Sequence, residues 1–222
     1  MAARYAPRVW LALATICVVW GSTFMAVAIA VRDLPPFVTM GIRHVIAGSL
    51  LLAWALPRGD REGDRIGWRQ LRAGFVFGGA LFLLSHGGLA WAQQTIPSGV
   101  AALLAGSIPL WMALLDRVFF GKRLHFSANL GLVCGFVGLA LLLDPFGEGS
   151  VDRVGAGVAI LAALAWAAGS LYSRGAPLPQ RPLVSAGLAA LCGGALLLVA
   201  AAASGELDDI RVTADAFGRL RI

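Results

Sequence analysis

Two basic side chains lie inside an apolar stretch of the sequence, where a charged or titratable group is unusual. Arg43 stands seven residues, or roughly 10 Å of helix, inside the stretch that begins at Pro36. A charge at that depth is costly and usually faces a cavity or a partner. Arg43 is therefore a candidate anchor for the carboxylate of a solute or an outer gate; alternatively, it reaches to lipid headgroups. His44 follows about 100° around the helix and cannot share that face, so we expect it to serve packing or to lie at the lipid interface.

His86 stands near the middle of a later apolar stretch, within Ser85-His86-Gly87-Gly88. Its small neighbours would let another helix or a ligand approach. We expect it to be the only titratable side chain near the middle of the bilayer, and its ordinary pKa of about 6.5 suits a proton carrier. The alternative is a neutral histidine hydrogen-bonded between helices. No Asp or Glu lies deep in any stretch, which argues against a carboxylate-based exchanger for cationic drugs.

Pro109 interrupts a fourth apolar stretch beside Gly106 and Ser107. Proline has no N–H, so the carbonyl of Ala105 loses its helical partner and the helix is expected to kink. Such a break is tolerated where it lines a cavity or where another helix fills the gap. We favour a kink that faces a substrate over a purely structural one.

Aromatic and hydroxyl side chains form a further candidate site. Aromatic faces with a few hydroxyl groups suit an amphipathic solute. The candidates for this site are Trp20, Ser22, Thr23, Trp166 and Ser170.

The composition requires a membrane as the setting for these residues. Of the 222 residues, 59% are hydrophobic and 14% charged, which excludes a soluble globule. Seven apolar stretches are each about long enough to cross a hydrocarbon core as a helix. They run from about Val9 to Val31, Pro36 to Leu56, Ala73 to Gln94, Ser98 to Phe120, Phe126 to Leu143, Gly155 to Tyr172, and Leu183 to Ala203.

The charges between these stretches predict the orientation of the chain. Arginines gather before the first stretch and after the second, fourth and sixth, whereas the other connections are mainly acidic. By the positive-inside rule, the N-terminus is predicted to be cytoplasmic. The net charge of +6 therefore reflects topology, and no nucleic-acid partner is expected. Cys17, Cys134 and Cys192 stand alone without metal-ligand spacing, so no metal and no cofactor is expected.

The chain matches itself at an offset of 146 residues, which places Trp20 on Trp166. In the next stretch Pro36, Gly41 and Gly48 fall on Pro182, Gly187 and Gly194. Five stretches fit in one unit, and an odd number inverts the second copy, as in many secondary transporters. The expected fold is an all-α integral membrane protein with seven transmembrane helices. It comprises a five-helix repeat (9–143), two helices of an inverted second repeat (155–203), and a polar tail (204–222) where a third helix of that repeat is expected to begin.

Several motifs together resemble the EamA-type exporters of the drug/metabolite transporter superfamily. They are Trp20-Gly21-Ser22-Thr23-Phe24, Pro35-Pro36-Phe37 with Arg43 and Ala47, Ser98 to Leu104 with Pro109-Leu110, and Phe120-Gly121-Lys122-Arg123-Leu124. The resemblance implies a ten-helix, five-plus-five carrier of the bacterial inner membrane that exports small metabolites such as amino acids by alternating access. Lys122 departs from the family, which usually has Glu after that glycine. Compared with the family, the sequence is expected to be C-terminally truncated, without helices eight to ten.

Three other functions are alternatives to a carrier. A seven-helix receptor of the photoreceptor kind would need a Schiff-base lysine in the seventh stretch, and none is there. A membrane enzyme would need a nucleophile with a base, paired acids or a metal cluster at bilayer depth. His44 and His86 without a buried carboxylate do not supply these groups, so no enzyme is expected. An inactive or non-transporting truncated protein is the remaining alternative. The expected partners are a small-molecule solute and the lipid bilayer, with Gly131, Gly135 and Gly138 forming a small-residue face for helix packing or a homodimer.

Overall fold

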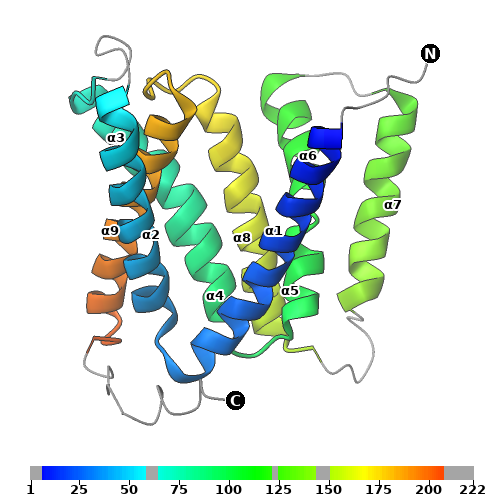
Figure 1. Ribbon diagram of the computed structural model, residues 1–222. Helices are drawn as coiled ribbons and strands as arrows, with labels where there is room; N and C mark the ends of the chain where they lie inside the picture. Colours follow the sequence, from blue (N-terminus) through cyan, green and yellow to red (C-terminus); the bar gives the residue numbers. More distant parts are fainter. Residues whose placement is uncertain (1–6, 59–64, 122–124, 144–150, 208–222) are drawn as a thin grey trace.

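The computed structural model describes residues 7–58, 65–121, 125–143 and 151–207, and within these ranges it contains helices and turns but no strand. The helices are α1 (Pro7–Asp33), α2 (Pro36–Ala55), η1 (Leu56–Arg58), α3 (Trp68–Gly78), η2 (Gly79–Gly87), α4 (Gly88–Ala92), α5 (Ser98–Ala105), α6 (Ile108–Phe120), α7 (Phe126–Leu143), α8 (Arg153–Ser173) and α9 (Pro182–Ala203). Successive spans run up and down in alternation (Figure 1). The described chain is a bundle of antiparallel apolar helices.

Six helical spans in the described ranges are long and apolar enough to cross a membrane. They are Val9–Asp33, Pro36–Arg58, Trp68–Ala92, Ser98–Phe120, Arg153–Ser173 and Pro182–Ala203. The fifth predicted stretch forms α7, which is apolar but shorter, with 18 residues. The predicted all-helical fold is therefore confirmed within the described ranges, and six of its spans have the length and composition of membrane-spanning helices. Most of the predicted tail, residues 208–222, lies outside the described residues.

Glycine lets α2 and α9 pack backbone to backbone. A Cβ atom on Gly48 would lie 2.8 Å from the carbonyl oxygen of Gly187 and 2.6 Å from the amide nitrogen of Leu191. Conversely, a Cβ on Gly194 would lie 3.1 Å from the carbonyl oxygen of Gly41 and 2.7 Å from the amide nitrogen of Val45. The contact of Gly48 with α9 and the contact of Gly194 with α2 therefore have the same form, with the two helices exchanged. Small residues that admit such close approach are the usual means of helix association in membranes.

Two charged side chains join the ends of the same helix pair. Glu206, just beyond α9, accepts hydrogen bonds from the amides of Phe37 and Val38 at 3.0 and 3.1 Å, where the N-terminal N–H groups of α2 lack helical partners. At the other end Arg181 donates to the carbonyl of Ala55 at 2.7 Å. An anion therefore caps the start of α2 and a cation caps its end, which fixes α2 against α9.

The helix α7 packs much less closely than the others. It stands at one side of the bundle in Figure 1. Only Gly135 of its glycine face meets a neighbour, the Leu110 side chain, whereas a Cβ on Gly131 or Gly138 would meet nothing within 4 Å. The small-residue face is therefore only partly used within the described chain.

Candidate functional site

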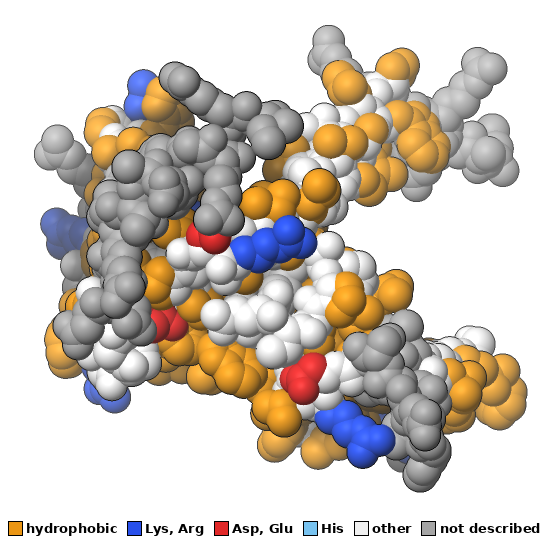
Figure 2. Space-filling view, turned by 90° about the horizontal axis from the view of Figure 1, so that it is seen from below, with side chains coloured by type: hydrophobic (Ala, Val, Ile, Leu, Met, Phe, Trp, Pro, Cys, Tyr) orange, Lys and Arg blue, Asp and Glu red, His pale blue; other side chains and the backbone are white. Residues whose placement is uncertain are grey.

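A cavity of about 430 Å³ lies between α1, the third span, the broken fourth span and α8. Its walls include Trp20 and Phe24 from α1, His86 from η2, Pro109 from α6 and Trp166 from α8. Trp20 lines it while remaining 55% exposed, so the cavity is open on the α1 side. The described surface is also hollowed on one side in the view from below, with hydrophobic side chains along the notch (Figure 2). A mostly apolar cavity of this size with a few polar atoms can hold a small organic molecule.

The third span widens where it lines this cavity. Between Gly79 and Gly87 the helix is π-helical, with i→i+5 hydrogen bonds that add a residue to each turn. Gly87 lies against Leu197 of α9 and Phe37 of α2. The close approach expected beside His86 is therefore made at Gly87 by two other helices. π-Helical turns occur often at functional sites, and this one presents Ser85 and His86 to the cavity.

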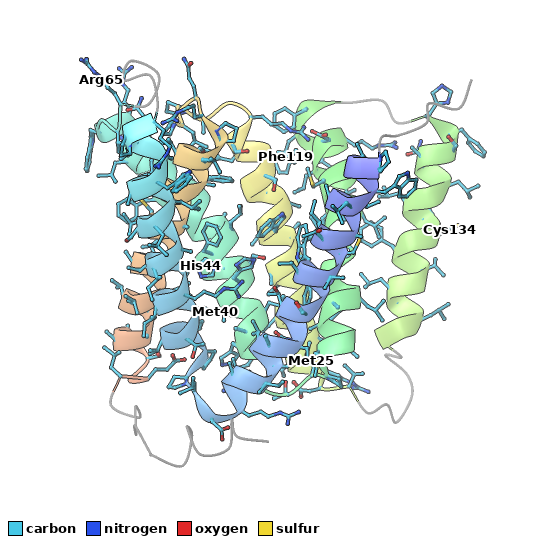
Figure 3. The ribbon with its side chains drawn as sticks, viewed as in Figure 1. Met25, Met40, His44, Arg65, Phe119 and Cys134 are labelled. Atoms are coloured by element: carbon cyan, nitrogen blue, oxygen red, sulfur yellow. The ribbon has the colours of Figure 1, made fainter. Side chains whose placement is uncertain are left out.

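His86 forms a hydrogen-bonded pair with His44, and the two ring nitrogens, His44 Nε2 and His86 Nδ1, are 2.9 Å apart. The other nitrogen of His44, Nδ1, lies 2.7 Å from the carbonyl oxygen of Met40. Trp166 stacks on His86 with 5.2 Å between ring centroids, and Phe82 contacts both imidazoles. Figure 3 shows His44 at about mid-height in the bundle, above Met40. The expectation that His86 is the only titratable side chain at this depth is therefore wrong.

The sequence contains a signal for the burial of His44. His44 comes three residues after Gly41 and four before Gly48, which places all three on one helical face. Gly41, His44 and Gly48 are all buried in the structure. Of the two roles expected for His44, packing and placement at the lipid interface, the structure shows packing. Its hydrogen bond to His86 joins residues 42 positions apart and could not be foreseen.

Arg43 occupies the neighbouring face of α2, as the 100° step between adjacent residues requires. It lines a small cavity of about 40 Å³ together with Thr23, His86 and Gln93. The guanidinium makes no hydrogen bond or ion pair with any residue that the structure describes. Gln93, which the sequence analysis missed, is buried and donates to the carbonyl of Phe24 at 2.9 Å, which links this wall to α1. An unpaired cation therefore stands beside the histidine pair.

The fourth span has the interruption that Pro109 predicts. It is divided into α5 and α6, and Pro109 lines the large cavity with Ala105. At the break the hydroxyl of Ser107 donates to the carbonyl of Leu104 at 2.5 Å and accepts from the indole N–H of Trp111 at 3.1 Å. The break is thus supported by side-chain hydrogen bonds next to the cavity.

The remaining candidates from the sequence divide between the cavities and the outside. Trp20 and Trp166 both line the large cavity, and Thr23 lines the small one. Ser22 and Ser170 are not among the lining residues of either cavity. The hydroxyls of Ser22 and Thr23 both donate to the carbonyl of Val19, at 3.0 and 2.8 Å. Within the described ranges, no cluster of three or more His, Cys, Asp or Glu side chains could hold a metal ion.

Comparison with known proteins gives consistent matches. The model of the EamA-like transporter family matches residues 8–144. The uncharacterized inner membrane transporter YedA of Escherichia coli K12 is 31% identical over 196 residues, covering 88% of this chain and 62% of the relative. The uncharacterized transporter YvbV of Bacillus subtilis is 26% identical, with 75% and 54% of the two chains covered. A probable amino-acid metabolite efflux pump of E. coli K12 is 25% identical, with 72% and 51% covered.

One protein of known crystal structure also matches, with a TM-score of 0.53 and 25% identity over 84% of this chain and 67% of that one. The chain spans less than two thirds of the length of the curated relatives described above.

Proposed function

The chain belongs to the EamA-like transporter family, and from this premise we propose that it acts as a secondary carrier that exports small metabolites, such as amino acids, by alternating access. The family and the names of the relatives point to a transporter rather than an enzyme. The solute class is supported by the amino-acid metabolite efflux pump among the relatives. The chain spans only 62% of the length of YedA. Activity as a carrier is therefore proposed for this chain and does not follow from the match alone.

The observation that carries the proposal is the cavity of about 430 Å³ at the junction of four spans. Trp20 and Trp166 supply aromatic faces for the apolar part of a solute, and His86 supplies a polar atom. Arg43, unpaired beside His86, would bind a carboxylate. Pro109 has no N–H to donate to the carbonyl of Ala105 in the same wall. These groups suit an amphipathic molecule with a charged end.

The reciprocal glycine contacts support an inverted repeat. Gly48 on Gly187 and Gly194 on Gly41 are related by the offset of 146 residues, and so are the contacts of Gly41 with Leu198 and of Gly187 with Leu52. A pseudo-twofold axis between α2 and α9 would generate this pattern. In carriers built from inverted repeats, the two halves rock about a site near the bilayer midplane. The proposed site residues are Trp20, Arg43, His86, Pro109 and Trp166, with Thr23 beside Arg43.

The proposed setting is a bacterial inner membrane with a cytoplasmic N-terminus and α7 as a seventh span. The alternation of helices brings the start of α1 and the ends of α2, α6 and α8 to one side of the bundle (Figure 1). Arg58 follows α2, Arg117 lies in the last turn of α6 and Arg174 follows α8. Arg65, labelled in Figure 3, lies at the same side. Basic residues on one side favour the cytoplasm for that side.

Replacement of Ala105 with phenylalanine is expected to reduce transport to background, because the added ring would occupy the cavity that Ala105 lines. The measurement is counterflow of radiolabelled amino acids into liposomes that contain the full chain. Ala53→Phe makes the same change at an exposed position of α2 and should keep the wild-type rate. Equal rates for Ala105→Phe and the wild type, or no exchange of any amino acid by the wild type, would contradict the proposal.

A further inference from the structure

The hydrogen bonds of the histidine pair determine where its protons lie. A carbonyl oxygen can only accept, so His44 Nδ1, 2.7 Å from the Met40 carbonyl, carries a hydrogen. A neutral imidazole has one N–H, so His44 Nε2 is then an acceptor. His86 Nδ1, 2.9 Å away, must therefore donate to it. In the neutral pair, His86 Nε2 is left as a bare acceptor.

This bare nitrogen belongs to a residue that lines the solute cavity. His86 lines both the large cavity and the small one. Its Nδ1 is occupied by His44, and Trp166 stacks on its ring, which leaves the edge that carries Nε2. His86 Nε2 has no hydrogen-bond partner among the residues that the structure describes. The neutral pair thus offers a single acceptor to whatever occupies the cavity.

One added proton reverses this property. In one arrangement, His86 binds the added proton at Nε2 and becomes the cation. In the other, His86 binds it at Nε2 while its Nδ1 proton passes to His44 Nε2, and His44 becomes the cation. In both arrangements His86 Nε2 carries a hydrogen and becomes a donor. A second proton would leave both rings with donors only, break the hydrogen bond and place two cations with ring centroids 5.0 Å apart. The pair therefore holds one exchangeable proton.

The other charged and titratable groups around the pair are few. Arg43 on α2 lines the small cavity with His86, and its positive charge adds to the cost of a second proton. The elements packed against the pair contribute Trp20 and Thr23 from α1 and Trp166 from α8, and none of these side chains carries a charge. Among the described residues that line the two cavities, none is a carboxylate that would hold the proton on the imidazoles.

We infer that the His44–His86 pair is a one-proton switch in the wall of the solute cavity. When neutral, it accepts a hydrogen bond from an ammonium or amide N–H of the solute at His86 Nε2; when protonated, it donates and displaces that group. Binding of the solute releases the proton to water in the cavity, so proton and solute compete for one nitrogen. His44 is a positioning residue that fixes the tautomer of His86. The inference rests on the proposed function for its solute, but the proton assignment is independent of transport.

The direct test is ¹⁵N NMR of the full chain in lipid vesicles with labelled histidine. His125 is the third histidine of the chain, and His125→Gln removes its signal. At alkaline pH both remaining rings are expected in the Nδ1–H form, identified by coupling of each nitrogen to its ring carbons. Acidification should convert His86 Nε2 to the protonated type with uptake of one proton per pair. A neutral pair in which either ring has the Nε2–H form, or uptake of two protons in one step, would overturn the inference.

Variants of His44 separate positioning from packing. His44→Phe keeps an aromatic ring but removes the acceptor, so His86 should lose its single tautomer. His44→Gln returns an acceptor oxygen and should restore the single tautomer of His86.

The pH dependence of binding is measured with L-leucine as the probe. The affinity of the wild type should fall about tenfold per pH unit below the midpoint of protonation, which is the slope for one competing proton. His86→Gln should abolish this slope. The same tautomer of His86 in His44→Phe and in the wild type, or a pH-independent wild-type affinity, would refute the switch. If the wild type has the expected tautomers but does not bind leucine at any pH, the proposed function is refuted and the proton assignment stands.

Discussion

Replacing Arg43 with glutamine is expected to slow the exchange of carboxylate-bearing solutes about 10- to 100-fold at low solute concentration. Arg43 belongs to α2, lines the small cavity together with His86, and has no hydrogen-bond or ion-pair partner among the described residues. An unpaired charge within a membrane helix costs about 2.5–3.5 kcal/mol on insertion scales, which a bound anion would offset. A hydrogen bond to a charged group contributes about 1.5–3 kcal/mol, and each 1.4 kcal/mol is about tenfold in affinity. Counterflow in liposomes measures the effect.

The matched control is Arg58→Gln at the end of the same helical span. Arg58 lies over the Trp54 ring at 3.7 Å and donates to the Trp54 carbonyl, outside both cavities. Arg58 lies in η1, the short helix that continues α2. Its replacement makes the same chemical change as Arg43→Gln and should leave the transport rate at the wild-type value. If Arg43→Gln transported carboxylates normally, or if Arg58→Gln lost as much activity, Arg43 would not be the anchor.

The second large effect is expected on stability. Gly48→Ala should lower the free energy of unfolding by about 1–3 kcal/mol, the range typical of overpacked sites. The new methyl group would lie 2.6 and 2.8 Å from backbone atoms of Leu191 and Gly187. Backbone atoms cannot rotate away as a side chain can, so α2 and α9 would have to separate. Unfolding of the purified chain in mixed micelles with increasing SDS gives the difference.

Gly138→Ala makes the same substitution in α7, where a Cβ meets nothing within 4 Å. It should leave the unfolding midpoint almost unchanged. Gly194→Ala, on the partner helix, should resemble Gly48→Ala because its Cβ would meet Val45 and Gly41 in the reciprocal way. Equal stability of Gly48→Ala and Gly138→Ala would show that the close α2–α9 contact is not required.

Features that depend on a repeating pattern were predictable from the sequence. Hydrophobic stretches indicated the spans, and proline indicated the break in the fourth one. The offset that pairs Trp20 with Trp166 picked out two side chains that line the same cavity. Patterns of this kind are local, or repeat at a fixed distance, so one sequence is enough to find them.

Features that depend on tertiary contacts were not predictable. The hydrogen bond of His44 with His86 and the cap of Glu206 on α2 join residues far apart in the chain, with no motif to link them. The π-helical segment 79–87 has no composition that distinguishes it from an α-helix. Ser22 was selected for its hydroxyl group, but the rotation of α1 leaves it outside both cavities.

The central claim, that the cavity opens alternately to the two sides of the membrane, can be tested by labelling one introduced thiol. Ala105→Cys would be made in a chain whose three cysteines, Cys17, Cys134 and Cys192, are replaced by alanine, and oriented vesicles would be treated with an impermeant thiol reagent from either side. Alternating access predicts reaction from both sides, and a transported solute should slow both reactions. If the thiol reacted from one side only, at a rate that no exchanged solute changed, alternating access of this cavity would be contradicted.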